Sequence, residues 1–183
     1  FFDAVLLGDD VETAVKHQQN MAALGGGGGA AAAALPILDE VTARRGDRLI
    51  GRTVTSVFSL SVDPPSILIS IAIGSELAEA IAETYGFSFA MLAEPQRAIA
   101  DAFAGRGDPE KRFDHGNWTE WPSGHPRLAG AVAAMDCDLI GTMETETHVL
   151  FAGGVTGVEG NPDAQPLIWH QRAYKGLAPL GAG

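Results

Sequence analysis

Hydroxylated and apolar residues alternate along residues 52–62, and this alternation is the most informative pattern in the chain. In an extended backbone, successive side chains point to opposite faces, so residues spaced two apart share one face. The pattern therefore predicts one strand with a hydroxyl-bearing face and an apolar face. The hydroxyl face would carry Thr53, Thr55, Ser59 and Ser61, and the apolar face Val54, Phe58, Leu60 and Val62.

A proline pair ends this strand, and a second strand follows directly. Asp63-Pro64-Pro65 stops the first strand because each proline removes a backbone donor and restrains the residue before it. The apolar run of residues 67–72 then predicts the second strand. Hydroxyl and backbone groups of two such strands would form a flat surface suited to a planar, hydrogen-bonding ring. A strand that simply faces solvent is the alternative, since Thr is a good strand former.

The remaining pattern predicts a mainly β domain with short helices. Antiparallel strands joined by few crossover helices favour a β-barrel over a doubly wound sheet. The expected elements are a hairpin of residues 40–44 and 47–51, a helix of residues 75–83 capped by Ser75, a strand of residues 87–92, a helix of residues 94–103, a long loop of residues 105–123, strands of about residues 130–145 and 148–159, and a last hairpin through Trp169 and Tyr174.

Residues 1–34 form a compositionally distinct N-terminal segment. Residues 10–24 have apolar positions near helical spacing and predict a helix. Five glycines and five alanines follow as residues 25–34. This tract is either a flexible linker or a stretch in which glycine and alanine stand in for other residues. We therefore expect an N-terminal segment of residues 1–34 and one domain of residues 35–183.

Charge and cysteine content exclude several classes of protein. The net charge of −11 argues against a nucleic-acid surface, which needs clustered Lys and Arg. The single cysteine, Cys137, excludes an internal disulfide, fits a reducing compartment and lies in an alternating strand pattern that predicts burial. No apolar run is long enough to span a bilayer, and no signal-peptide pattern opens the sequence. We expect a cytoplasmic protein that binds neither membranes nor nucleic acids.

Common catalytic and nucleotide-binding motifs are missing from the sequence. It has no G-x-G-x-x-G fingerprint, no P-loop and no G-x-S-x-G elbow. Its Cys and His spacing suits no zinc site, so we expect no metal.

Three features are candidates for binding or chemistry. Ser75 opens a helix, where free backbone N–H groups attract anions, although it also fits a simple helix cap. Arg106, Lys111 and Arg112, followed by Phe113, form a basic cluster that suits phosphate, unless it is a solvated loop. His148 begins a strand, where a structural role is the usual one for a lone histidine.

Six segments, in order, resemble the short-chain flavin reductases, which bind FMN in a split β-barrel. The resemblance covers about residues 48–177 and begins with the hydroxyl-rich strand and its Asp-Pro-Pro end. The other matching segments are residues 103–106 with 112–113, Gly124-His-Pro-Arg-Leu128, Asp136-Cys-Asp138, residues 147–155 and residues 166–174. The sequence departs from the family at residues 72–74, where Ala-Ile-Gly replaces the usual Asn and Arg, and after Pro36.

This resemblance implies a homodimeric oxidoreductase that passes a hydride from NADH to bound FMN, with FAD the less expected flavin. Backbone and hydroxyl groups of the two strands would hold the isoalloxazine, while Ser75, Lys111 and Arg112 would hold the phosphate. His148 would orient the nicotinamide, and Tyr174 would either cover the flavin or pack in the core. The full set of expected cofactor-binding residues is Arg52, Thr53, Val54, Thr55, Ser56, Ser70, Ile71, Ala72, Ser75, Arg106, Lys111, Arg112, Phe113 and Tyr174.

The electron acceptor has three interpretations. Most relatives supply reduced flavin to a partner monooxygenase. The wording of residues 52–65 and 113–118 also resembles the corrin reductases, which keep their FMN and reduce cob(II)yrinic acid a,c-diamide in cobalamin biosynthesis. A non-catalytic flavin- or haem-binding split barrel is the third interpretation.

Overall fold

The computed structural model describes residues 37–177. The helix and the Gly/Ala tract expected within residues 1–34 lie outside the described residues. No helix among residues 37–177 is long and apolar enough to cross a membrane.

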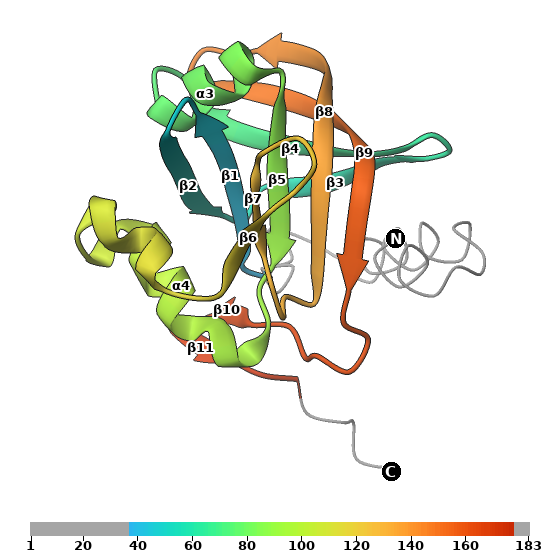
Figure 1. Cartoon of the computed structure of the whole chain (residues 1–183). Coiled ribbons are helices and arrows are strands. Elements are labelled where there is room, and N and C mark those ends of the chain that lie inside the picture. Colours follow the sequence, from blue (N-terminus) through green and yellow to red (C-terminus); the bar gives the residue numbers. More distant parts are fainter. Residues whose placement is uncertain (1–36, 178–183) are drawn as a thin grey trace, which may run out of the picture.

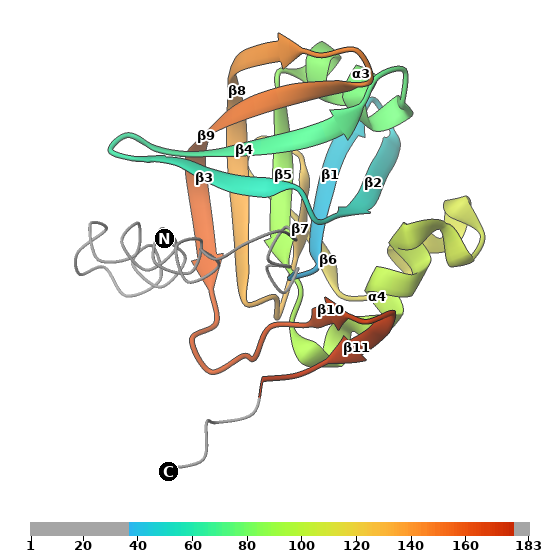
Figure 2. The ribbon, with the colours of Figure 1, turned by 180° about the vertical axis from the view of Figure 1, so that it is seen from behind.

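A curled antiparallel sheet of seven strands forms the body of the protein (Figure 1). Its strand order is β2-β1-β5-β8-β9-β4-β3. The strands are β1 (Asp39–Arg45), β2 (Arg48–Val54), β3 (Val57–Val62), β4 (Pro65–Ala72), β5 (Gly86–Met91), β8 (Ala133–Glu144) and β9 (His148–Gly160). The two edge strands, β2 and β3, follow one another in the chain and do not pair, so the barrel is split between them (Figure 2). The expected fold class, a mainly β split barrel with short helices, is confirmed.

The prediction of a single strand over residues 52–62 is wrong. Thr55 and Ser56 are not in a strand, and they separate β2 from β3. These two residues carry the chain from one edge of the sheet to the other. The expected apolar face is also wrong in β3, where Phe58 is 56% exposed and Leu60 51% exposed. The alternation itself is present, but it is the Ser59 side that is partly buried. Alternation shows that two faces differ, and only tertiary packing decides which of them turns inward.

Short helices and two small hairpins cover one side and one end of the barrel. The helices are α3 (Glu76–Thr84), η1 (Glu94–Gln96), α4 (Arg97–Asp101), η2 (Ala102–Arg106) and η3 (Pro109–Asp114). The hairpins pair β6 (Trp118–Glu120) with β7 (Pro126–Leu128), and β10 (Ile168–His170) with β11 (Ala173–Lys175). The long loop expected over residues 105–123 therefore contains a helix and a strand. Aromatic side chains packed on the barrel order this segment, and their distant partners are invisible to local pattern.

Several other predicted elements are confirmed. Ser75 caps α3, since its hydroxyl accepts the backbone N–H of Ala78 at 3.2 Å. The first hairpin turns at Gly46, which has a φ of +60°. Cys137 is buried, and burial raises the pKa of its thiol, so an inert packing role is the right interpretation.

The barrel interior is filled by side chains that alternate inward from its strands. The largest buried members are Ile67, Ile69, Phe87, Phe89, Met135 and Phe151. A second apolar cluster lies outside the sheet, beneath α4, and includes Leu92, Ile99, Phe103, Trp121 and Leu128. Close packing extends to the backbone at Gly153 of β9, where a Cβ atom would lie 2.5 Å from Phe87 Cζ.

We predict that Gly153→Ala destabilises the fold by about 1–3 kcal/mol, because the added methyl overpacks the barrel against Phe87. Gly141→Ala is the matched control, since a Cβ there would meet nothing closer than 3.9 Å. Chemical denaturation of both variants measures the difference. Equal stabilities would show that the barrel adjusts to the methyl group.

Candidate functional site

The two strand segments expected to hold a flavin ring lie side by side at the split of the barrel. The backbone N–H of Ser70 in β4 donates to the carbonyl of Ser56 at 3.2 Å, across the start of β3. Arg52, Thr55 and Ser56 are exposed, whereas Ile71 points into the barrel core. The position of Ile71 leaves only its backbone to contact a ligand.

His148 lies next to the same part of β4. It begins β9 and pairs directly with Ala72, and the N–H of Ile73 donates to the carbonyl of Thr147 at 3.0 Å. The imidazole is exposed, with Nδ1 2.8 Å from the Thr147 hydroxyl. His148, the candidate catalytic residue, therefore borders the strand segments expected to hold the flavin. Its Nε2 atom takes no part in the contact with Thr147.

Ser75 has the geometry of a helix cap, which limits what it offers to an anion. Its hydroxyl accepts an N–H bond from within α3, and its own N–H donates to the Ala72 carbonyl at 3.3 Å. Glu76 and Glu79 in the first turn already complement the helix dipole. The Ser75 O–H can still donate, so its expected phosphate contact is one hydroxyl bond at most.

Phe103 and Arg112 bring the basic segment onto the outer face of β2. Arg112 Nη1 donates to the carbonyl of Gly51 at 3.2 Å. The Phe103 ring packs on the same backbone, since a Cβ on Gly51 would lie 2.5 Å from Phe103 Cε1. Phe113 lies 5.0 Å from Phe103 and 5.0 Å from Trp118, measured between ring centroids. These aromatic contacts fix η3 beside the sheet.

A pocket of about 290 Å³ lies between β2, the start of α3 and η3. Its lining residues are Arg48, Leu49, Ile50, Gly51, Glu76, Pro109, Glu110, Arg112 and Phe113. The volume is at the lower end for a small-molecule site, so it suits part of a larger ligand. Two of the expected residues, Arg112 and Phe113, thus lie near the N-terminus of α3, which Ser75 caps.

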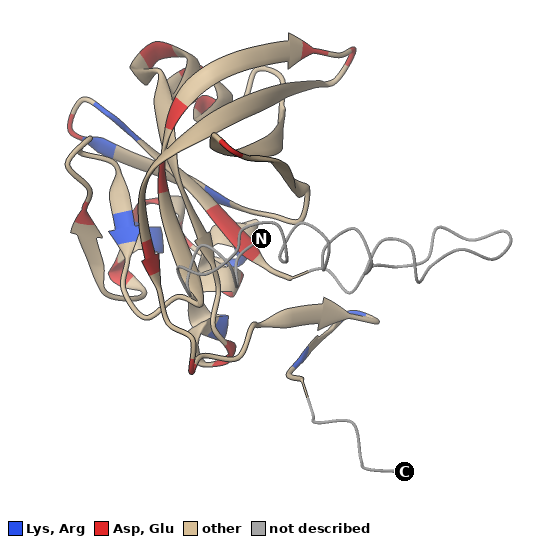
Figure 3. Cartoon of the chain, turned by 90° about the vertical axis from the view of Figure 1, so that its right-hand side faces the viewer, with Lys and Arg blue, Asp and Glu red and all other residues tan. Residues whose placement is uncertain are grey.

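Acidic and basic positions are interspersed over the described chain (Figure 3), and most of its arginines have an acidic partner. Six arginines form ion pairs with acidic side chains: Arg44, Arg45, Arg48, Arg97, Arg106 and Arg127. Within residues 37–177, no ion pair engages Arg112 or Lys111. Arg112 Nε is buried and has no acceptor there. Arg112 also lines the pocket, so the exposed part of its guanidinium, with no carboxylate partner, suits an oxygen-rich anion such as phosphate.

Arg106 and Tyr174 belong to a different cluster. Arg106 Nη1 lies 2.8 Å from Asp101 Oδ1, and its guanidinium sits 5.4 Å from the centre of the Trp169 ring. Tyr174 donates to the same Asp101 oxygen at 2.6 Å, and burial together with this contact raises the pKa of Tyr174 to about 12. For Tyr174, the packing interpretation fits these contacts better than a flavin cover does.

Sequence reasoning missed Glu40, a fully buried acid of β1. Thr53 lies directly across from it in β2, and the Thr53 hydroxyl is 2.7 Å from Glu40 Oε1. The one signal in the sequence was an acidic residue within a predicted strand. Only the structure shows that helices cover the face of β1 that carries Glu40, and therefore that this acid is buried. Asp39 beside it is also buried. Burial of each carboxyl group raises its own pKa.

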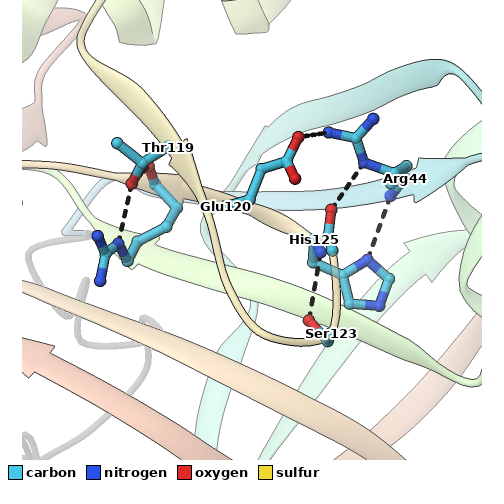
Figure 4. Close-up of polar contacts among 7 residues, drawn as sticks. Arg44, Thr119, Glu120, Ser123 and His125 are labelled. Atoms are coloured by element: carbon cyan, nitrogen blue, oxygen red, sulfur yellow. Dashed lines mark hydrogen bonds and ion pairs between the residues drawn. The ribbon is translucent and has the colours of Figure 1, made fainter.

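A second missed network joins the β6–β7 hairpin to β1 (Figure 4). Arg44 donates its backbone N–H to His125 Nδ1 at 3.2 Å and its Nε to the Gly124 carbonyl at 2.7 Å, and it pairs with Glu120. Ser123 donates to Asp136 at 2.7 Å and accepts the N–H of His125.

This network is not a nucleophilic triad. The Ser123 hydroxyl donates to Asp136, and Nδ1 of the buried His125 already accepts a backbone bond, so the imidazole does not activate the serine. The network positions the hairpin that carries Trp118, which packs on Phe113. No cluster of potential metal ligands occurs within residues 37–177.

Comparisons with known proteins show the family to which this chain belongs. The flavin reductase like domain model matches residues 40–178. The chain is 34% identical over 131 residues to the reductase component of an FADH(2)-dependent resorcinol hydroxylase from Rhizobium sp., covering 72% of this chain and 73% of the relative. It is 33% identical to an FMN reductase (NADH), RutF, from Ancylobacter novellus, covering 73% and 74%.

The solved structure of a Streptomyces globisporus NADH:FAD oxidoreductase, in complex with NAD and FAD fragments, is similar with a TM-score of 0.73. Its sequence identity is 26%, and the match covers 80% of this chain and 88% of that chain. The protein belongs to the flavin reductase-like domain family, a family of oxidoreductases.

We predict that His125 makes the fold less stable at acidic pH. Burial lowers the pKa of His125 from its ordinary value of 6.5, so the folded protein keeps it neutral while the unfolded chain takes up a proton. Stability should fall as the pH drops below 6.5 towards this lowered pKa. Thermal unfolding of wild type and His125→Gln between about pH 5 and about pH 8 measures the effect. Parallel pH profiles would contradict it.

Proposed function

We propose that the protein is an NADH-dependent reductase of FMN. The observation that carries this proposal is Arg112, a half-buried arginine without an ion pair among residues 37–177, which lines a pocket between β2 and the start of α3. The strand segments around Ser56 and Ser70 lie at the adjoining split of the barrel. The relative named FMN reductase (NADH) supports the same pairing of substrate and reductant.

The residues present suit a flavin phosphate and ring. Lys111 and Arg112 would bind the phosphate, with one hydroxyl contact from Ser75. Backbone and hydroxyl groups of residues 52–56 and 70–72 would orient the ring, while residues 72–74, which have no polar side chain, leave backbone contacts at the end of β4. When bound, a flavin supplies the ring that accepts a hydride from the nicotinamide.

The chain's own contribution to catalysis would be positioning. In this proposal His148 orients the nicotinamide carboxamide through its exposed imidazole, next to Ala72. Hydride transfer depends on the distance and angle between two stacked rings, so a side chain that orders one ring raises the rate without exchanging a proton.

We propose FMN over FAD as the flavin. The relative from Ancylobacter novellus, which is named FMN reductase (NADH), supports FMN. FAD occurs in the name of the Rhizobium hydroxylase system and with the Streptomyces oxidoreductase, so FAD is the competing flavin.

For the electron acceptor, supply of reduced flavin to a monooxygenase has the better support. The Rhizobium relative is named as the reductase component of a hydroxylase. Reduction of a cob(II) corrinoid stays a prediction from the sequence, as does the non-catalytic flavin- or haem-binding module.

We also propose that the protein is a homodimer. Large apolar side chains are exposed on the outer surface of the described barrel, among them Phe58 and Leu60 on β3 and Ile140 and Met143 on β8. These strands lie on the same half of the sheet, separated by β9 and β4. Exposed large apolar residues gathered on one half of a sheet are typical of an association surface.

We predict that Lys111→Ala with Arg112→Ala weakens FMN binding at least about tenfold, because charge-assisted hydrogen bonds contribute roughly 1.5–3 kcal/mol each. Quenching of flavin fluorescence on titration measures the affinity. Lys175→Ala is the control, since Lys175 is an exposed cation at the far hairpin. Unchanged affinity in the double variant would show that these side chains do not contact the phosphate.

We predict that wild-type protein loaded with FMN loses its yellow colour when NADH is added without oxygen, and that His148→Ala keeps FMN but bleaches about tenfold more slowly or worse. Anaerobic stopped-flow absorbance separates binding from reduction. Wild-type protein that stays yellow would make it a flavin binder without reductase activity. Equal rates in the two proteins would remove His148 from the mechanism.

A further inference from the structure

Glu40 is a buried acid on the face of β1 that the helices cover. Alternation places Glu40, Thr42 and Arg44 on this outer face, with Asp39 and Val41 on the barrel side. The Glu40 residue is 0% exposed. A carboxyl group in such a place is costly unless it is neutral or paired, so its contacts indicate what it does.

The contacts of Glu40 suit a neutral carboxylic acid. The Thr53 hydroxyl lies 2.7 Å from Glu40 Oε1 and 3.2 Å from the carbonyl of Ala100 in α4. A hydroxyl group has one proton and cannot donate fully to both oxygens. If Glu40 is protonated, its O–H donates to Thr53, and Thr53 donates to Ala100. Burial is the largest effect and raises the pKa of Glu40 well above its ordinary value; the hydrogen bond with Thr53 lowers it and the charge of Asp39 raises it, with burial dominant.

Arg112 approaches the same part of β2. Its Nη1 donates to Gly51, two residues before Thr53, and its positive charge acts on the pKa of Glu40 in the lowering direction. Glu40 Oε2 and Arg112 Nε are both buried, and neither has a hydrogen-bond partner within residues 37–177. Gly51 and Thr53 are two residues apart on the same face of β2, so the partners of Arg112 and Glu40 lie side by side on that face, while no ion pair joins the two side chains within residues 37–177.

We propose that Glu40 is a positioning residue for a flavin phosphate: while neutral it leaves the Arg112 guanidinium free to bind the phosphate, and once ionised it competes for that guanidinium. This role rests on the proposed function. By linkage, a bound phosphate favours the protonated form of Glu40. At a pH where Glu40 of the free protein is ionised, the protein therefore takes up a proton when FMN binds. Affinity for FMN then falls as the pH rises.

Two charged groups of the described chain act on Glu40, and they provide the controls. These are Asp39, its neighbour in β1, and Arg112 of η3. Asp39 is a buried acid with a raised pKa as well, but it lies on the other face of the strand. Asp39→Asn therefore removes a buried titrating acid without removing a contact to Thr53 or Arg112. Glu40→Gln keeps the size and a donor at position 40 while removing the charge.

Titration of FMN against wild type, Glu40→Gln and Asp39→Asn, from about pH 6 to about pH 9, tests the role. We expect wild type and Asp39→Asn to lose affinity about tenfold as pH rises, which is the effect of one charge-assisted contact. Glu40→Gln should keep its affinity. The FMN phosphate loses its second proton near about pH 6, which affects all three proteins alike. Riboflavin, which lacks the phosphate, should show no loss of affinity with pH in wild type.

Calorimetry of wild type alone gives a second measurement that does not depend on a folded variant. FMN binding at a pH where the wild-type affinity has begun to fall, in two buffers of different ionisation enthalpy, should show proton uptake. No uptake, or a wild-type pH profile in Glu40→Gln, would overturn the role of Glu40 and leave the proposed function standing. Wild type that binds no FMN at any pH would instead overturn the proposed function and this role with it.

Discussion

The packing of the Phe103 ring on the backbone of Gly51 determines where the candidate site forms. The ring occupies the space that any side chain at position 51 would need. Because Phe103 also contacts Phe113, the segment with the basic residues follows it onto β2. The Gly51 carbonyl is then in reach of Arg112. An aromatic contact on a strand backbone thus brings a cation to a sheet edge in an acidic chain.

The sequence predicts the local features of the fold well, because local features depend on neighbours in the chain. The Ser75 cap, the hairpin at Gly46 and the two long strands β8 and β9 each follow from turn chemistry or alternation. The break at Thr55 and Ser56 was missed because two small residues in an alternating pattern do not differ from a continuous strand. The chain passes from one edge strand, β2, to the other, β3, at these two residues because the sheet curls into a barrel, and local sequence does not show that curl.

The candidate site was predictable in part, for a similar reason. The start of β3 lies beside β4 because the two strands follow one another in the chain, whereas His148 reaches them through the long-range pairing of β4 with β9. Arg106 resembles Arg112 in sequence, but Asp101 is five residues away and pairs with it. Glu40 gave little local signal, since its burial comes from α4, which lies far along the chain.

The short link between β2 and β3 has a geometric consequence for the split of the barrel. Three peptide units join Val54 to Val57, so their Cα atoms can be at most about 11 Å apart. At that end the two sheet edges have a fixed maximum separation. Towards the far ends of β2 and β3, no covalent link of this kind limits it. The covalent link thus limits how far the two edges can separate near Thr55 and Ser56, while packing alone holds them further along.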